Sequence, residues 1–391
     1  MLSSRFRLRP KWCCVTEVSI AKSPEIMTRK MTAMILTTRS ILAVAVLSVT
    51  VPTWASPDAP KNTFLDAALL RTIRHDDVPR IRRLLAKGAD PNAGNSERSA
   101  NALMYAVAGG DLRVVRLLLN AGAKVNKQTK EGLTPLMAVG KKNMLPIMKL
   151  LLVRGAEVNP KNVLTTTPLM LAAVAGNVDA GRLLLQRGAK VNTQGAGDFT
   201  ALLYATDGDH IAFMRFLMDH GADPEIRDEI GRTALIRATD ADNPATVRLL
   251  LDKGANVSTR EELGYTPLMM AHRVSIARLL LERGADMEAK DDLSGGTPLI
   301  HHSVTGDIGI VKLLIDKGAA ISARDSGGQT ALMRSALWSP LAERNTVISL
   351  LLERGADLEA RDSKGRTALA LAAMYKKEDV VALLKKAGAK E

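Results

Sequence analysis

The polar and apolar positions of residues 167–192 predict two short helices. Thr167 stands before Pro168, and a threonine followed by a first-turn proline is typical of a helix start. A second helix with leucines at 183–185 comes after a Gly-Asn turn, and Gly188 follows at a position where a left-handed backbone favours glycine. Helices of roughly eight to ten residues are not stable alone. The unit therefore needs packed neighbours.

Copies of this unit recur along the chain. Each copy closes with a Gly-Ala pair, and the pairs begin at Gly88, Gly122, Gly155, Gly188, Gly221, Gly254, Gly284, Gly318, Gly355 and Gly388. Thr-Pro-Leu or Thr-Ala-Leu opens most copies, at Thr134, Thr167, Thr200, Thr233, Thr266, Thr297, Thr330 and Thr367, with Asn101-Ala102-Leu103 as a degenerate first version. Most successive glycines are 33 or 34 residues apart, which identifies a tandem repeat.

A period of 33 with a Thr-Pro-Leu opening and a Gly-Ala-x-x-Asn close resembles the ankyrin repeat. The resemblance covers about residues 62–391. It implies an all-α fold, an ankyrin-repeat solenoid of about ten helix-turn-helix units joined by short β-hairpin-like fingers. Because each unit contacts only its neighbours, we expect residues 62–391 to form one domain whose first and last repeats act as polar caps.

Two repeats depart from the period. The stretch from Thr266 to Gly284 is three residues short, so we expect the turn between its helices to be cut near 272–275. The stretch from Thr330 to Gly355 is longer than usual, which predicts an enlarged turn that contains 337–340. Such irregularities can mark a binding edge, and drift in a tolerant loop is the alternative.

Residues 27–55 have the pattern of a secretory signal peptide. Basic residues precede an apolar run at 41–51, and small residues at 53–55 predict cleavage after Ala55. A membrane anchor or a fortuitous apolar helix is the alternative. Our hypothesis is that translation starts at Met27, so that residues 1–26 are an untranslated leader, and we expect 56–61 to be a linker. This pattern predicts a periplasmic or secreted protein with no stable membrane insertion after cleavage.

Composition narrows the possible functions. Both cysteines, Cys13 and Cys14, precede the predicted cleavage site, so the remainder has no disulfide, Cys-based metal site or catalytic thiol. The net charge is +13, but after residue 55 the 46 Lys and Arg residues are mixed with 39 Asp and Glu residues. A modest excess without a basic stripe is compatible with an acidic partner and disfavours nucleic acid.

The sequence lacks the motifs that are typical of an enzyme. The sequence contains no Ser-centred nucleophile elbow, phosphate-cradling glycine loop or His-Glu-x-x-His helix. Glycine-rich stretches at 195–197, 295–296 and 327–328 fall between repeats, where turns need glycine. We therefore predict a non-enzymatic protein without cofactors.

Three histidines are the strongest candidates for a metal site. His301 and His302 are adjacent, and His272 lies one repeat earlier. Neighbouring helical residues point about 100° apart, so at most one of the pair can readily share a ligand sphere with His272. We expect His302 to be partly buried and hydrogen-bonded, and we predict no metal site.

Two further sets of residues recur at equivalent repeat positions. Four carboxylates, Asp207, Asp209, Asp240 and Asp242, are expected at the turns, either as an acidic patch for a basic partner or Ca²⁺ or as solvated turn residues. A methionine series occupies a position where ankyrin repeats commonly have histidine, and we expect it to form a buried apolar seam: Met104, Met137, Met170, Met269 and Met333.

By resemblance, ankyrin-like proteins bind partners through finger tips and the exposed ends of first helices. The matching finger-tip residues are Lys130, Glu131, Asp198, Glu229, Arg232, Tyr265, Lys364 and Arg366. The matching first-helix ends are Lys141, Lys142, Asp207, Asp240, Val304, Leu337 and Trp338. Trp338 is either an exposed hot spot or a residue buried within its own insertion.

The sequence thus predicts a monomeric, exported protein–protein interaction scaffold with a protein partner of unknown identity. Two alternatives remain open. One is an inhibitor or protective partner of a specific enzyme, and the other is a secreted effector that acts on host proteins.

Overall fold

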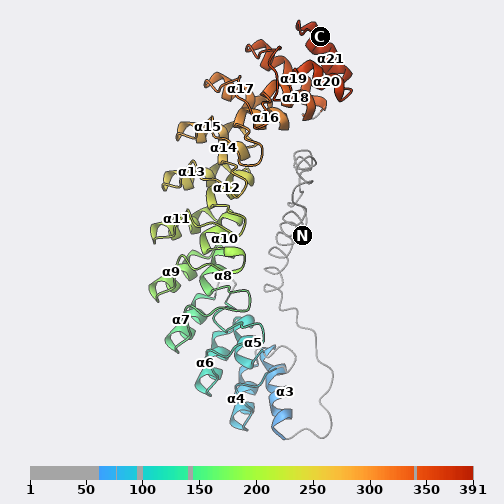
Figure 1. Cartoon of the computed structure of the whole chain (residues 1–391). Coiled ribbons are helices and arrows are strands. Elements are labelled where there is room, and N and C mark those ends of the chain that lie inside the picture. The colour runs from blue at the N-terminus through green and yellow to red at the C-terminus, as the bar shows by residue number, and fades with distance from the viewer. Residues whose placement is uncertain (1–60, 76, 95–99, 140–143, 339–340, 391) are drawn as a thin grey trace. The chain divides into compact units, whose positions relative to one another are not determined.

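The computed structural model describes residues 61–75, 77–94, 100–139, 144–338 and 341–390 (Figure 1), with the backbone alone at 61–63, 338 and 341–342. The predicted leader and signal peptide, and the linker up to residue 60, lie outside these residues. The described chain falls into two compact units, which we call the N-terminal unit (61–226) and the C-terminal unit (227–390).

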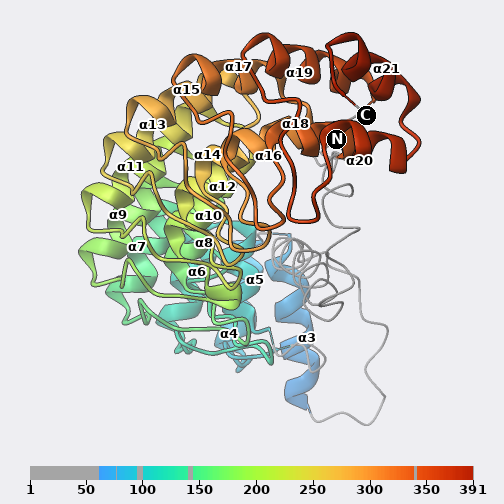
Figure 2. The same cartoon turned by 45° about the horizontal axis from the view of Figure 1, so that its top comes forward.

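The N-terminal unit is a stack of short helices. They are α3 (Lys61–Ile73), α4 (Val78–Ala86), α5 (Ala102–Gly109), α6 (Leu112–Asn120), α7 (Leu145–Val153), α8 (Pro168–Val174), α9 (Val178–Gln186), the 3₁₀ turn η2 (Ala196–Asp198), α10 (Ala201–Asp207) and α11 (Ile211–Asp219). The first helices α3 and α5, and then α8 and α10, pack on each other, while α4, α6, α7, α9 and α11 form the second layer (Figure 2).

The C-terminal unit repeats this arrangement. Its helices are α12 (Ala234–Asp240), α13 (Pro244–Asp252), α14 (Pro267–Met270), α15 (Val274–Glu282), α16 (Pro298–Thr305), α17 (Ile308–Asp316), α18 (Ala331–Trp338), α19 (Leu341–Glu353), α20 (Ala368–Met374) and α21 (Glu378–Lys386). First helices stack from α12 to α20 and second helices from α13 to α19. The all-α fold of stacked helix pairs is confirmed.

The predicted helix boundaries are confirmed at both ends. The Thr167 hydroxyl accepts a hydrogen bond from the Met170 N–H at 3.4 Å, and the Asn101 side chain caps α5 in the same way at 3.0 Å. All ten glycines of the Gly-Ala pairs have φ between 83° and 97°. These angles favour glycine because, in the left-handed region, a Cβ comes too close to the backbone carbonyl oxygen that follows it.

Asparagines join successive repeats of the N-terminal unit. The Asn159 amide donates to the Gly188 carbonyl at 2.9 Å and accepts from the Lys190 N–H at 2.9 Å. Asn92, Asn126 and Asn192 make the same pair of bonds to the repeats that follow them. Each of these asparagines therefore satisfies two backbone groups of the next repeat.

The core is built largely from small and aliphatic side chains. The predicted methionine seam is confirmed, since all five methionines are 4% exposed or less. In the last described repeat Ala370 takes the seam position and is exposed. The finger between repeats is a turn without a named strand in the described residues, apart from an isolated antiparallel bridge between Gly94 and Asn101.

One repeat lacks its first helix. Residues 135–138, which follow Thr134, form a turn instead of the expected α-helix. Lys141 and Lys142 lie outside the described residues. Pro146 nonetheless occupies the first turn of α7, as Pro79 and Pro244 do in α4 and α13, which confirms the predicted proline positions.

The short repeat is shortened mainly in its first helix, so the prediction of a cut turn was wrong. Helix α14 has four residues, whereas α15 keeps nine because its apolar face is packed in the core. His302 fills the vacated space, at 1% exposure, with Nε2 2.8 Å from the Leu268 carbonyl oxygen. In a full helix that carbonyl would accept a hydrogen bond from the N–H of the residue four positions later in the chain. His302 is thus hydrogen-bonded as expected, but fully buried.

The long repeat also differs from the prediction of an enlarged turn. Leu337 and Trp338 end α18, and the extra residues lengthen α19 to thirteen, while Ser339 and Pro340 lie outside the described residues. The added segment brings in Arg344, whose side chain is 1% exposed and hydrogen-bonds to Asp379 of α21. The insertion therefore joins the last two repeats.

We expect Gly254→Ala to lower the free energy of unfolding by about 1–2 kcal/mol, because Gly254 has φ of +85° and a Cβ there would meet no atom within 4 Å. The cost is then purely that of the backbone conformation. Gly254→Asn should lose clearly less, since asparagine tolerates this region. Urea denaturation of the three proteins measures the difference, and equal losses for Ala and Asn would contradict the explanation.

Candidate partner-binding face

The fingers of the C-terminal unit are each built on a buried carboxylate. One oxygen of Asp228 accepts the N–H groups of Ile230 at 3.1 Å and Arg232 at 2.8 Å. Asp362 holds the N–H groups of Lys364 and Arg366 in the same way, both at 2.9 Å. Glu261, Asp291 and Asp325 have the same role, and Asn162 has it in the N-terminal unit. These bonds fix the conformation of the finger tips.

Arginines bind the other oxygen of several of these carboxylates. Arg237 reaches Asp228 at 2.6 Å, and Arg366 places Nε at 2.9 Å and a terminal nitrogen at 2.7 Å from Asp362. Burial opposes ionisation of Asp362, but the hydrogen bonds from Arg366 outweigh it and lower the pKa to about 2. The carboxylate beneath this finger is therefore charged at neutral pH.

Neighbouring fingers are also tied to each other. In the C-terminal unit the N–H of Asp292 donates to the Leu263 carbonyl at 2.9 Å, that of Ser326 to Ser294 at 2.8 Å, and that of Ser363 to Gly327 at 3.0 Å. In the N-terminal unit Val163 donates to Glu131, and Ala196 donates to Leu164. Each unit thus carries a row of linked fingers with little freedom to move independently.

Most of the predicted partner-binding residues are accessible on the fingers or the first-helix ends of their own unit. Lys130, Glu131, Asp198, Asp207, Glu229 and Lys364 are exposed, and Arg232, Asp240 and Arg366 are half-buried. Of Trp338 only the backbone is described, so its role as a hot spot remains a prediction. Val304, predicted at a first-helix end, is buried instead, at 7% exposure.

Tyr265 was wrongly predicted as an accessible finger-tip residue. It is 5% exposed and packs in an apolar cluster with Ile236, Met269 and Met270. Its ring meets the His301 ring edge-on, with centroids 5.3 Å apart. Burial raises the pKa of the Tyr265 hydroxyl above its usual range. The finger turn directs this side chain inward, toward the helices.

An ion pair connects a finger with the end of a first helix. Arg232 binds Asp240 at 3.0 Å, and His272 of the next repeat has Nε2 4.0 Å from the same carboxyl group. Burial opposes ionisation of Asp240, but His272 and Arg232 lower its pKa, and Asp240 in turn raises the pKa of His272. Asp242 is bound by Arg273 at 2.7 Å.

The predicted four-carboxylate patch stays a prediction. Asp240 and Asp242 face the cations just described, which offset their charge. Asp207 and Asp209 are exposed and belong to the N-terminal unit.

The described residues contain no group of three or more His, Cys, Asp or Glu side chains placed to hold a metal ion. Both ring nitrogens of His301 are buried without a hydrogen-bond partner among these residues. Burial lowers the pKa of His301 to about 3, so the ring is neutral. The neutral ring packs edge-on against Tyr265.

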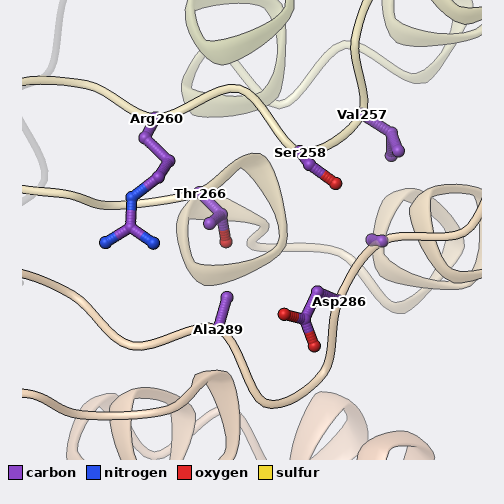
Figure 3. Close-up of a pocket in the computed structure, with 7 residues that line it drawn as sticks. Val257, Ser258, Arg260, Thr266, Asp286 and Ala289 are labelled. Atoms are coloured by element: carbon purple, nitrogen blue, oxygen red, sulfur yellow. The ribbon is translucent and has the colours of Figure 1, made fainter.

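A pocket of about 100 Å³ lies between two adjacent repeats of the C-terminal unit (Figure 3). Its lining consists of Val257, Ser258, Arg260, Thr266, Ala285, Asp286 and Ala289. Sites for cofactors and drug-sized ligands occupy about 300 Å³ or more. This pocket is therefore too small for such a ligand, and the open finger face is the better candidate site.

The family model for ankyrin repeats in three copies matches residues 69–162, 136–228, 221–291 and 276–362. The chain belongs to the ankyrin-repeat family. A mouse (Mus musculus) 2-5A-dependent ribonuclease is 37% identical over 75 residues, which are 19% of this chain and 10% of that protein. The chain thus spans about a tenth of the length of this curated relative, so the match does not assign ribonuclease activity to this chain.

Among solved structures, the human ASB11 ankyrin repeat domain is similar at a TM-score of 0.51 and 24% identity. The similarity covers 56% of this chain and 98% of that domain, and it shows the fold alone. Ankyrin repeats are generally non-enzymatic modules, and they indicate a protein–protein interaction scaffold. None of the helices in the described part of the chain has the length and apolar character needed to span a bilayer.

Sequence reasoning missed the buried finger carboxylates. A signal was present, because an acidic residue, Asn or Thr stands five or six residues before nearly every opening threonine. It also missed the contact between Arg366 and Met374, with a guanidinium nitrogen 3.9 Å from the sulfur. No local pattern reveals that contact, since it depends on how the finger folds back on α20.

The His272–Asp240 pair predicts a pH dependence of stability. Because the folded-state pKa of His272 is raised, its contribution is fully present below the unfolded pKa of 6.5 and is lost as the pH rises through the raised value. We expect the stability difference between the natural protein and His272→Gln to shrink as the pH rises above 6.5 and through the raised pKa of His272. Denaturant titrations across this range measure it. Asp240→Asn should reduce the trend, because Asp240 is the main cause of the raised pKa, and a difference that grows with pH would contradict the explanation.

Proposed function

We propose that this protein is an exported scaffold that binds a protein partner through its finger tips and the adjoining ends of its first helices, in the periplasm or outside the cell. The observation that carries the proposal is the row of linked fingers. Their tips are fixed by buried carboxylates and by finger-to-finger bonds, so little conformational freedom is lost when a partner binds.

The sequence supports export, since residues 27–55 have basic, apolar and small-residue segments in the order of a signal peptide. An inhibitor or protective partner of a specific enzyme would use the same rigid face, and so would a secreted effector. The three differ in where the protein resides and in how many partners it binds.

Site-specific crosslinking tests this function. A photo-crosslinking side chain is placed at Glu229, an exposed finger tip, and in a matched variant at Lys312, which is exposed on α17. We expect a discrete crosslinked product in the native cell envelope or medium from the Glu229 variant and none from the Lys312 variant. The mature N-terminus, read from the same preparation, should begin at Ser56.

A product from Lys312 but not from Glu229 would keep the scaffold and overturn the choice of face. If neither position gives a discrete product, the proposed function is contradicted. A mature N-terminus upstream of Ser56 would contradict export by signal cleavage at the expected site.

A further inference from the structure

The last helix pair exposes two large apolar side chains next to a finger. Met374 ends α20 and Tyr375 follows it, and each is 53% exposed. Val304, which corresponds to Met374 two repeats earlier, is buried at 7% exposure, and the residue at that position in the α12 repeat is the ion-paired Asp240. The last repeat is thus more apolar at this position than the α12 repeat and more exposed than the α16 repeat.

Arg366 joins this apolar pair to the finger. Its guanidinium is held by Asp362 and lies 3.9 Å from the Met374 sulfur. In the α12 repeat the corresponding pair is Arg232 and Asp240, where the arginine meets a carboxylate instead. The finger tip and the first-helix end therefore form one continuous surface in the last repeat, and its helix side is uncharged.

The turn after Tyr375 is strained in an unusual way. Lys376 has φ of +54°, in the left-handed region. The corresponding residues in other repeats are Gly110, Gly176 and Gly306, or Asp209 and Asp242. Glycine and aspartate tolerate this conformation, whereas lysine is disfavoured there. Backbone strain that a simple substitution would relieve points to a role for the lysine side chain.

The charges around this surface are mainly positive. Lys364 and Lys376 are exposed, and Lys377 is half-buried at the start of α21. Of the nearby acidic residues, Asp362 lies under Arg366, and Asp379 accepts hydrogen bonds from Arg344 and Asn345. Glu378 and Asp379 are both exposed at this edge, opposite three lysines. An approaching anionic group therefore meets several cations around an apolar centre.

From this juxtaposition we infer that the last repeat is a docking site for an acidic peptide segment of a protein partner, with a bulky hydrophobic residue seated on Met374 and Tyr375 and carboxylates facing Lys364, Lys376 and Lys377. The inference rests on the proposed function and adds to it the location of one site and the chemistry of the ligand. Phosphate-rich nucleic acid would satisfy the cations and its bases can stack on Tyr375, but it brings no aliphatic side chain for Met374, so the peptide fits the apolar centre better.

The test uses the full chain and a short dye-labelled peptide with Phe-Leu at its centre and Glu and Asp on both sides, with fluorescence anisotropy as the readout. We expect saturable binding that weakens as salt is added, and that weakens further when Phe-Leu is replaced by Ala-Ala. Tyr375→Ala should lower the affinity about tenfold. Lys312→Gln, which removes an exposed cation from α17, should leave it unchanged.

Lys376→Gly separates a functional role from a structural one. We expect it to raise the melting temperature because it relieves the left-handed strain, while the affinity for the peptide falls by up to about fivefold because one charge contact is lost. A structural role alone would not couple higher stability to weaker binding.

Three results would overturn the inference: no binding of the peptide, equal binding of the Phe-Leu and Ala-Ala peptides, or an affinity unaffected by Lys376→Gly and Tyr375→Ala. Competition by a single-stranded oligonucleotide of equal charge, at equal strength, would assign the surface to nucleic acid instead. If the native partner is still crosslinked from Glu229 while the peptide fails to bind, the scaffold function stands and only this site is lost.

Discussion

Successive repeats in the described part of the chain are joined by hydrogen bonds that only a neighbouring repeat can complete. In the N-terminal unit an asparagine amide binds both a carbonyl and an N–H of the next repeat, as Asn159 does with Gly188 and Lys190. In the C-terminal unit Glu288 and Glu359 accept one such N–H each. Basic side chains there donate to a carbonyl of the next repeat. Arg260 donates to the Lys290 carbonyl, Lys290 to that of Arg324, and Arg324 to that of Arg361. Since two short helices are not stable alone, these links and the buried seam are what make a repeat persist.

The same constraint explains why the protein is suited to binding. A finger fixed by a buried carboxylate, and tied to the fingers beside it, presents its tip without first having to be ordered. The surface can then vary while the frame stays constant. Two corresponding contacts show this variation. Arg232 forms an ion pair with Asp240, whereas Arg366 contacts the apolar Met374 beside exposed lysines. The left-handed backbone at Lys376 lowers stability, which is consistent with a functional role for the lysine side chain.

The sequence predicted the features that depend on local backbone chemistry. Threonine caps, first-turn prolines and left-handed glycines recur in register, because each satisfies a requirement of its own helix end. Features decided by packing between repeats could not be predicted in this way. Tyr265 occupies a finger position but turns inward, and His302 takes the place of a missing helical turn. The extra residues near Trp338 lengthen α19, and Arg344 of that helix binds Asp379 of α21. The candidate face was thus predicted in outline, and its accessible residues required the structure.

The central claim is that each repeat is stabilised by bonds to its neighbour, and native-state hydrogen exchange on Asn159→Ala tests it most directly. Two hydrogen bonds to the backbone of the next repeat are lost, so we expect a destabilisation of about 1–3 kcal/mol. Amide protection should fall in α7, α8 and α9, the helices next to the Asn159 hydrogen bonds, and much less elsewhere. Gln186→Ala, an exposed change in α9, should leave protection as it was. Unchanged protection in Asn159→Ala, or an equal loss along the whole chain, would contradict the account.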